Sequence, residues 1–231
     1  MGSIYVVRHG QAAFGTDDYD RLTEVGFAQA RLLGAHFRAR RIRFDAIFTG
    51  TLRRQIETAQ AIVEGHPALA AAMPECFPGL DEYHAEAILE AHLGELPPLA
   101  AAAAARRDPT VVRDHFRVLR EALLAWADDR SKPAGMAAFS KFQEEAVAAL
   151  VAARTRFPDG HVLLVSSGGP IAAMTAAALN APPAAAVELN LRIRNTALSE
   201  FVATPRRHHL LSFNALPHLD THPDASLITY T

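Results

Sequence analysis

Short apolar runs alternate along the chain with longer segments in which apolar residues recur at helical spacing. Three runs have the length and the β-branched content of buried strands: 3–8 (SIYVVR), 44–50 (FDAIFTG) and 161–166 (HVLLVS). A helical segment follows each of them: 22–40, 51–65 and a third that we expect to begin at Pro170. This alternation of strands and helices predicts an α/β layered fold.

The ends of these elements carry local signals. We expect Thr23 to cap the first helix and Gly65 to end the second, because short hydroxyl side chains favour helix starts and glycine favours helix ends. Segments 196–203 and 208–214 have the pattern of two closing strands. Their connection, TPRR, is short, so the two strands are predicted to be antiparallel.

The pattern changes to alanine-rich helix with arginines between residues 85 and 133. Pro97, Pro98 and Pro109 break this region into pieces. High helix propensity predicts a helical arm, and we interpret it as an insertion within a single domain spanning residues 1–231.

Composition narrows the functional classes. Half of the residues are hydrophobic and the formal net charge is −2, which argues for a packed globule without a dedicated nucleic-acid surface. The single cysteine, Cys76, cannot form an internal disulfide, so a cytoplasmic protein is expected. We expect no membrane partner, since apolar runs are too short, and no metal site, since Pro217 and Pro223 disfavour a helix that would align His218 with His222.

Three of the predicted strands end in turns rich in residues that can bind or react with a ligand: VVRHGQ with Arg8 and His9, FTGTLRRQ with Arg53 and Arg54, and VSSGGP at 165–170. Strand ends are where open α/β sheets usually build ligand sites. Arginine in the first turn of a helix opposes the helix dipole, which predicts an anion between its guanidinium and the backbone amides. A fourth segment, GLDEYHAE, adds Asp81, Glu82 and Glu86.

Taken together, VVRHGQ, YDRLTEVGFAQARLLG, TLRRQIETAQ, GLDE, LLVSSGGPI and RNTALSEF resemble the histidine phosphatase superfamily, also called the phosphoglycerate mutase-like family. The motifs occur in the family's order and cover most of the chain outside the arm. The resemblance implies a three-layer α/β/α sandwich around a mixed, mostly parallel sheet, with the 85–133 insertion as a cap over the active site.

The resemblance also implies residue roles. His9 matches the nucleophile that takes the phosphoryl group, and Glu82 matches the general acid and base. Arg8 and Arg54 match the phosphate-binding arginines, and Ser167 and Gly168 lie in the third phosphate-binding turn. Arg54 is preferred to Arg53 because it stands two places after Leu52, as in the family. The arginines supply the positive charge, so no metal or other cofactor is expected.

This chain departs from the family at Ser167, where members normally have a second histidine. The expected function is a metal-independent phosphatase for a small phosphorylated substrate, working through phosphohistidine. Two alternatives stay open. One is a phosphoglycerate mutase, disfavoured because no arginine follows Glu82 in DEYHAE, and the other is a phospho-ligand binder that has lost turnover. A homodimer is left open as well.

Overall fold

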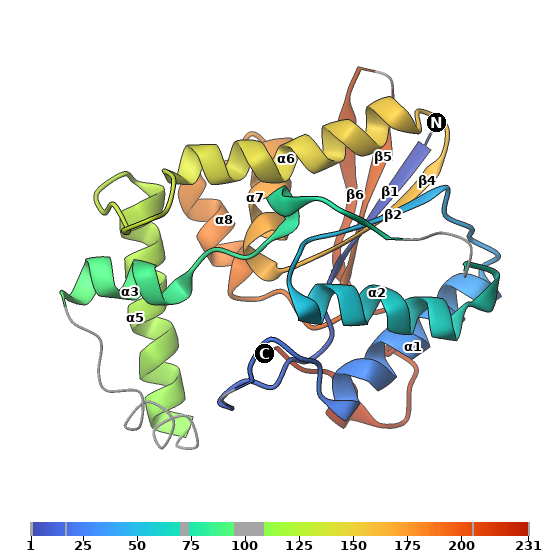
Figure 1. Ribbon diagram of the computed structural model, residues 1–231, viewed down its shortest axis with the longest axis horizontal. Coiled ribbons are helices and arrows are strands. Elements are labelled where there is room, and N and C mark those ends of the chain that lie inside the picture. The colour runs from blue at the N-terminus through green and yellow to red at the C-terminus, as the bar shows by residue number, and fades with distance from the viewer. Residues whose placement is uncertain (1, 17, 70–73, 95–108, 205, 231) are drawn as a thin grey trace.

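The computed structural model describes residues 2–230 except 17, 70–73, 95–108 and 205. Its centre is a sheet of six strands in the described part of the chain (Figure 1). Their spatial order is β3 (Glu75–Cys76), β2 (Ala46–Thr49), β4 (His161–Ser166), β1 (Gly2–Arg8), β5 (Leu198–Ala203) and β6 (His208–Ala215). The pairs from β3 to β1 are parallel, whereas β5 and β6 are antiparallel. The predicted mixed, mostly parallel sheet and its antiparallel closing pair are therefore confirmed.

Helices cover both faces of this sheet because its inner strands are apolar on both sides. In β1, Ile4 and Val6 belong to a core shared with α6 (Phe139–Arg156) and α7 (Gly168–Ala178). Tyr5 and Val7 face the opposite core, which includes residues of α1 (Glu24–Ala39) and α2 (Arg53–Gly65). Each large apolar side chain buried in this way contributes about 1.5–3 kcal/mol. The result is the predicted α/β/α sandwich (Figure 1).

The start of α1 follows the sequence signal. Thr23 is its N-cap, and the Thr23 hydroxyl accepts a hydrogen bond of 3.1 Å from the amide of Gly26. Glycine is needed where this helix meets the end of β1, because a Cβ on Gly10 would lie 2.5 Å from the Gly26 carbonyl oxygen. This close approach places the residues after β1 directly beside the first turn of α1.

The predicted helical arm lies on one side of the sandwich (Figure 1). It contains α3 (Ala85–Leu93) and α5 (Pro109–Ala127), while Pro97, Pro98 and the alanine run lie outside the described residues. Leu123 and Trp126 of α5 are buried in the same core as α6 and α7. Arg120 of α5 also donates a 2.7 Å hydrogen bond to Glu188 of α8 (Pro183–Asn190). These contacts join the arm to the sandwich through the C-terminal half of α5.

Short helical turns complete the chain at η1 (Pro67–Leu69), η2 (Pro78–Leu80) and η3 (Ala225–Leu227). One boundary differs from the prediction. Helix α7 begins at Gly168, two residues before Pro170, because Gly168 and Gly169 already have helical conformation. The first turn of α7 therefore lies closer to the sheet edge than the position of the proline suggests.

Candidate active site

The carboxyl ends of β1, β2 and β4 meet at one edge of the sheet. Arg8 of β1 pairs with Ser166 of β4, and Thr49 at the end of β2 pairs with Val165. The predicted loops after these strands are thereby brought together, as expected for parallel neighbours. His9, Arg54 and Ser167, which are far apart in sequence, all lie at this edge.

His9 is 2% exposed, and its backbone is fixed on both sides. The His9 amide donates to the Ser166 carbonyl at 2.8 Å, and the Asn195 side-chain amide donates to the His9 carbonyl at 3.2 Å. Asn195 comes from the RNTALSEF segment, just before β5, and next to it Thr196 has a positive φ of 52°. The turn at 195–196 thus positions the histidine, a role that the sequence pattern did not assign to it.

The hydrogen bonds of the His9 ring define its tautomer. Nδ1 lies 2.8 Å from the Gly10 carbonyl oxygen, which can only accept, so Nδ1 carries the proton. Nε2 accepts a hydrogen bond from Arg54 Nε at 3.3 Å. The Nε2 lone pair therefore faces the guanidinium of Arg54.

The electrostatics of this position keep His9 neutral. Burial, followed by the positive charges of Arg8 and Arg54, lowers the pKa of His9 well below 6.5. A neutral imidazole keeps its lone pair available at and below neutral pH. The environment that suits an incoming anion is thus the same environment that prevents the histidine from being protonated.

Arg54 is held between two groups in the first turn of α2. It is 6% exposed, its Nη1 donates to Asp20 at 2.6 Å, and its guanidinium lies 5.1 Å from the centroid of the Tyr19 ring. The same Asp20 carboxylate accepts a 2.9 Å hydrogen bond from the backbone amide of Arg53. The Asp20 carboxylate therefore supplies negative charge at this helix start from within the chain.

Asp20 is a site residue that the sequence reasoning missed. Leu52 precedes α2 and makes no side-chain cap, so the helix is capped by a carboxylate 33 residues earlier in the chain. A cap supplied from another loop has no spacing signal within the helix itself. The one available signal was an arginine in a helix start without a local acidic partner.

Arg8 makes its contacts with backbone carbonyls. Its Nη1 donates to the carbonyl of Ile193 and, at 2.7 Å, to that of Tyr230, while Nε has no partner among the described residues. Burial lowers the pKa of Arg8, although arginine still remains charged at physiological pH. The segment at the C-terminal end thereby forms one wall of the site and orients this guanidinium.

Ser167 is fully buried beside the start of α7. Its hydroxyl accepts a 2.8 Å hydrogen bond from Gln55, whose amide also donates to the Leu80 carbonyl at 2.8 Å. The hydroxyl proton has no acceptor among the described residues and is free to donate. The serine thus keeps one neutral donor where the family's second histidine would place a larger ring, with Gly168 as the next residue of the turn.

Glu82 lies at the N-terminus of α7. Its two carboxyl oxygens accept hydrogen bonds from the Gly169 amide at 3.1 and 3.2 Å. Burial raises the pKa of Glu82, and the bonds from Gly169 and the charges of Arg54 and Arg8 only partly oppose it. Gly169 permits this contact, because a Cβ there would lie 2.1 Å from Glu82 Oε1.

The neighbouring carboxylates have other surroundings. Asp81 accepts hydrogen bonds from the backbone amide and the hydroxyl of Thr51, both at 2.6 Å, and so ties η2 to the start of α2. Glu86 is exposed on α3. Glu82, in contrast, is buried in the electrostatic range of Arg8 and Arg54.

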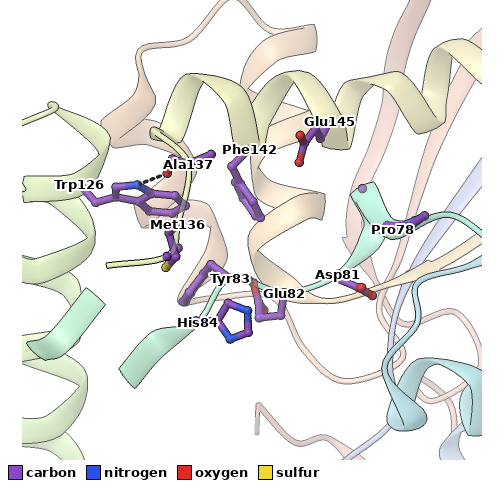
Figure 2. A pocket seen from close by; sticks show the side chains of 12 residues that line it. Pro78, Asp81, Glu82, Tyr83, His84, Trp126, Met136, Ala137, Phe142 and Glu145 are labelled. Carbon is purple, nitrogen blue, oxygen red and sulfur yellow. Dashed lines mark hydrogen bonds between the residues drawn. The ribbon is translucent and has the colours of Figure 1, made fainter. Parts of the chain in front are cut away.

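A cavity of about 190 Å³ opens beside Glu82 (Figure 2). It lies between the Asp81–His84 segment, the end of α5 and the start of α6, and its aromatic wall includes Tyr83 and Trp126. Glu82 therefore lines this cavity and is also in electrostatic range of Arg8 and Arg54, the two arginines beside His9. The site consists of an anion end at the sheet edge and a larger compartment under the arm.

The described residues include no cluster of three or more His, Cys, Asp or Glu side chains that could hold a metal ion. His218 is buried, and its Nε2 is 2.9 Å from the hydroxyl of Thr196, in the turn beside His9. Among the described helices, none is long and apolar enough to cross a membrane.

Comparisons with known proteins agree with this geometry. The family model described as "Histidine phosphatase superfamily (branch 1)" matches residues 4–216. A 2,3-bisphosphoglycerate-dependent phosphoglycerate mutase of Methylobacterium sp. (strain 4-46) is 43% identical over 75 residues, which cover 29% of this chain and 36% of that enzyme. The match to this curated relative therefore spans about a third of its length.

Solved structures show the same fold. Bacillus stearothermophilus YhfR has a TM-score of 0.69 at 20% identity, over 94% of this chain and 99% of that one. A phosphoserine phosphatase from Entamoeba histolytica, in complex with phosphoserine, has a TM-score of 0.65 at 18% identity, over 95% and 100%. A mycobacterial glucosyl-3-phosphoglycerate phosphatase has a TM-score of 0.60 at 21% identity, over 92% and 98%.

The Asp20 contacts predict a stability difference between two neighbouring carboxylates. Asp20→Asn should lower the free energy of unfolding by about 1–2 kcal/mol, because it weakens the cap of α2 and leaves the buried Arg54 without its counter-ion. Asp18→Asn removes only exposed ion pairs with Arg53 and Arg21 and should change the free energy of unfolding by less than about 0.5 kcal/mol. Urea unfolding measures both, and equal effects would contradict the assignment.

Proposed function

Because the chain belongs to the histidine phosphatase superfamily, branch 1, we propose that it is a metal-independent phosphomonoesterase that forms a phosphohistidine at His9. One observation carries the proposal: His9 is held neutral, and its Nε2 accepts a hydrogen bond from the buried Arg54. A lone pair on nitrogen is the group that attacks phosphorus, and the flanking guanidiniums are the charges that hold a phosphate dianion beside it.

In the first step His9 Nε2 attacks phosphorus and the bond from phosphorus to the leaving oxygen breaks. Arg8 and Arg54 stabilise the negative charge on the phosphoryl oxygens while one bond to phosphorus forms and the other breaks. Arg54 Nε then donates its hydrogen bond to one of these oxygens and no longer to His9 Nε2. Glu82, whose raised pKa favours its protonated form, gives its proton to the leaving alkoxide. The products of this step are an alcohol and phosphohistidine.

In the second step water attacks the phosphohistidine. The Glu82 carboxylate accepts a proton from the water, the bond from phosphorus to Nε2 breaks, and inorganic phosphate leaves. Both residues return to their starting protonation states. The Ser167 hydroxyl and the backbone amide of Gly168, at the start of α7, each donate a hydrogen bond to a phosphoryl oxygen. The substrate is a small phosphorylated molecule whose alcohol part lies in the cavity beside Glu82.

Mutase activity is the second candidate, because the Methylobacterium relative is a phosphoglycerate mutase. We rank it below hydrolysis. A mutase must hold a second anionic group of its substrate, and no Lys or Arg lines the cavity beside Glu82 among the described residues. The chain also lacks an arginine directly after Glu82.

Turnover of an aryl phosphate tests the proposed reaction. The protein should release phosphate from p-nitrophenyl phosphate without added metal, and rapid acid-free quenching should trap phosphate on His9. His9→Asn should lower kcat by at least about 10³-fold, since the covalent acceptor is lost. His92→Asn, a change in an exposed histidine of α3, should have no effect.

Two results would count against hydrolysis. Absence of both phosphate release and His9 labelling would favour a phospho-ligand binder, and a large gain in the Ser167→His variant would then identify the missing group. Isomerisation of 3-phosphoglycerate that is faster than its hydrolysis would favour the mutase.

The role of Glu82 predicts a dependence on both pH and leaving group. As pH rises through the raised pKa of Glu82, its proton is lost and kcat/KM should fall, while the acid limb, set by His9, lies well below pH 6.5. Glu82→Gln should remove the basic limb. It should lower kcat/KM, which reports the first step, about 10²-fold or more for an alkyl phosphate and far less for p-nitrophenyl phosphate, whose leaving group needs no proton.

Glu86→Gln is the matched control on the same segment and should leave the pH profile unchanged. An equal loss for alkyl and aryl esters in Glu82→Gln would show that Glu82 is not the acid.

A further inference from the structure

The cavity beside Glu82 has walls that are chemically unlike the phosphate end of the site. Three aromatic rings meet in its lining, with centroid distances of 6.0 Å for Tyr83 and Trp126, 6.2 Å for Tyr83 and Phe142, and 5.4 Å for Trp126 and Phe142. The interplanar angles are 61°, 70° and 53°, so the rings form a corner and not a stack. Met136 lies in front of this corner (Figure 2).

The polar atoms of the aromatic wall are engaged within the protein. Trp126 Nε1 donates to the Ala137 carbonyl at 3.1 Å, and the Tyr83 hydroxyl accepts from Asn190 at 2.8 Å. The rings therefore contribute apolar surface and the negative potential of their faces, with few hydrogen bonds left for a sugar or a carboxylate.

The charged residues of the lining are acidic. Asp81, Glu82 and Glu145 border the cavity, and none of its described lining residues is Lys or Arg. His84 is the one lining group able to carry a positive charge. Figure 2 shows Glu145 directed down from α6 on the same side as Phe142. Lys141 lies 3.9 Å from Glu145 but does not line the cavity. With Glu82 in its protonated form, Asp81 and Glu145 supply the negative charge, which disfavours a second anionic group and, with the aromatic rings, favours a cation.

We propose that this cavity selects phosphomonoesters whose alcohol carries an ammonium group, such as an amino alcohol or a quaternary ammonium alcohol. The inference rests on the proposed hydrolysis at His9 and names its substrate class. The phosphate is held by Arg8 and Arg54, Glu82 lies at the leaving oxygen, and the ammonium end extends into the acidic and aromatic compartment. Both Glu82 and Tyr83 are in electrostatic range of Arg8, which places the compartment next to the phosphate end.

A pair of substrates with the same shape and different charge provides the test. Phosphocholine and 3,3-dimethylbutyl phosphate differ in one atom, nitrogen or carbon, and therefore in one positive charge. The value of kcat/KM should be about five- to tenfold higher for phosphocholine. Glu145→Gln should reduce this preference to about half or less, because it removes one acidic wall.

Glu144→Gln is the matched control, since Glu144 is the preceding residue on α6 and does not line the cavity. It should leave the preference unchanged. If p-nitrophenyl phosphate is hydrolysed while the two isosteres are hydrolysed equally well, the proposal is wrong and the hydrolase assignment stands. Faster hydrolysis of 3-phosphoglycerate than of phosphocholine would overturn it in the same way.

Binding can be measured without turnover, because Trp126 is the single tryptophan of the chain and lines the cavity. Choline should change its fluorescence at a lower concentration than 3,3-dimethylbutan-1-ol does, and Glu145→Gln should narrow the difference. If no ester is hydrolysed but choline is preferred, the cavity assignment holds and the proposed hydrolysis fails. If choline is not preferred, the cavity assignment is wrong whether or not any ester is hydrolysed.

Discussion

The contact between Arg54 Nε and His9 Nε2 is the interaction on which the site depends. It forms only while His9 is neutral and Nδ1 carries the proton, which the Gly10 carbonyl ensures. The two arginines beside the ring oppose its protonation, and in the proposed reaction the same positive charge attracts phosphate. Binding of the anion and availability of the nucleophile are therefore coupled through a single electrostatic arrangement.

The surrounding structure serves to hold this arrangement. Asp20 compensates the charge of Arg54 and caps α2, and the segment that ends near Tyr230 orients Arg8 through its carbonyl. Burying a guanidinium is costly unless such partners are present. At Ser167 the site keeps a donor without charge, so the positive charge beside His9 comes from the two arginines. Glu82, in turn, is kept at the N-terminus of α7, where its proton is needed.

Local sequence signals predicted much of the fold and part of the site. Apolar strands of 3–8 and 161–166, the Thr23 cap and the end of the second helix at Gly65 all follow from short-range chemistry, and the structure confirms them. Contacts made across the sheet edge could not be predicted in this way. Asp20, Asn195 and the carbonyl of Tyr230 reach the site from other loops, and the buried pairing of Ser167 with Gln55 spans 112 residues.

The protonation state of His9 tests the central claim most directly. Long-range proton–nitrogen correlation spectra of ¹⁵N-histidine-labelled protein, with the His9 signals assigned by their loss in His9→Asn, report the tautomer and its titration. We predict a neutral ring protonated on Nδ1 that does not titrate between about pH 7.5 and 6, since its pKa lies well below 6.5. A ring protonated on Nε2, or a cationic ring at pH 6.5, would contradict the assignment of Nε2 as the phosphoryl acceptor.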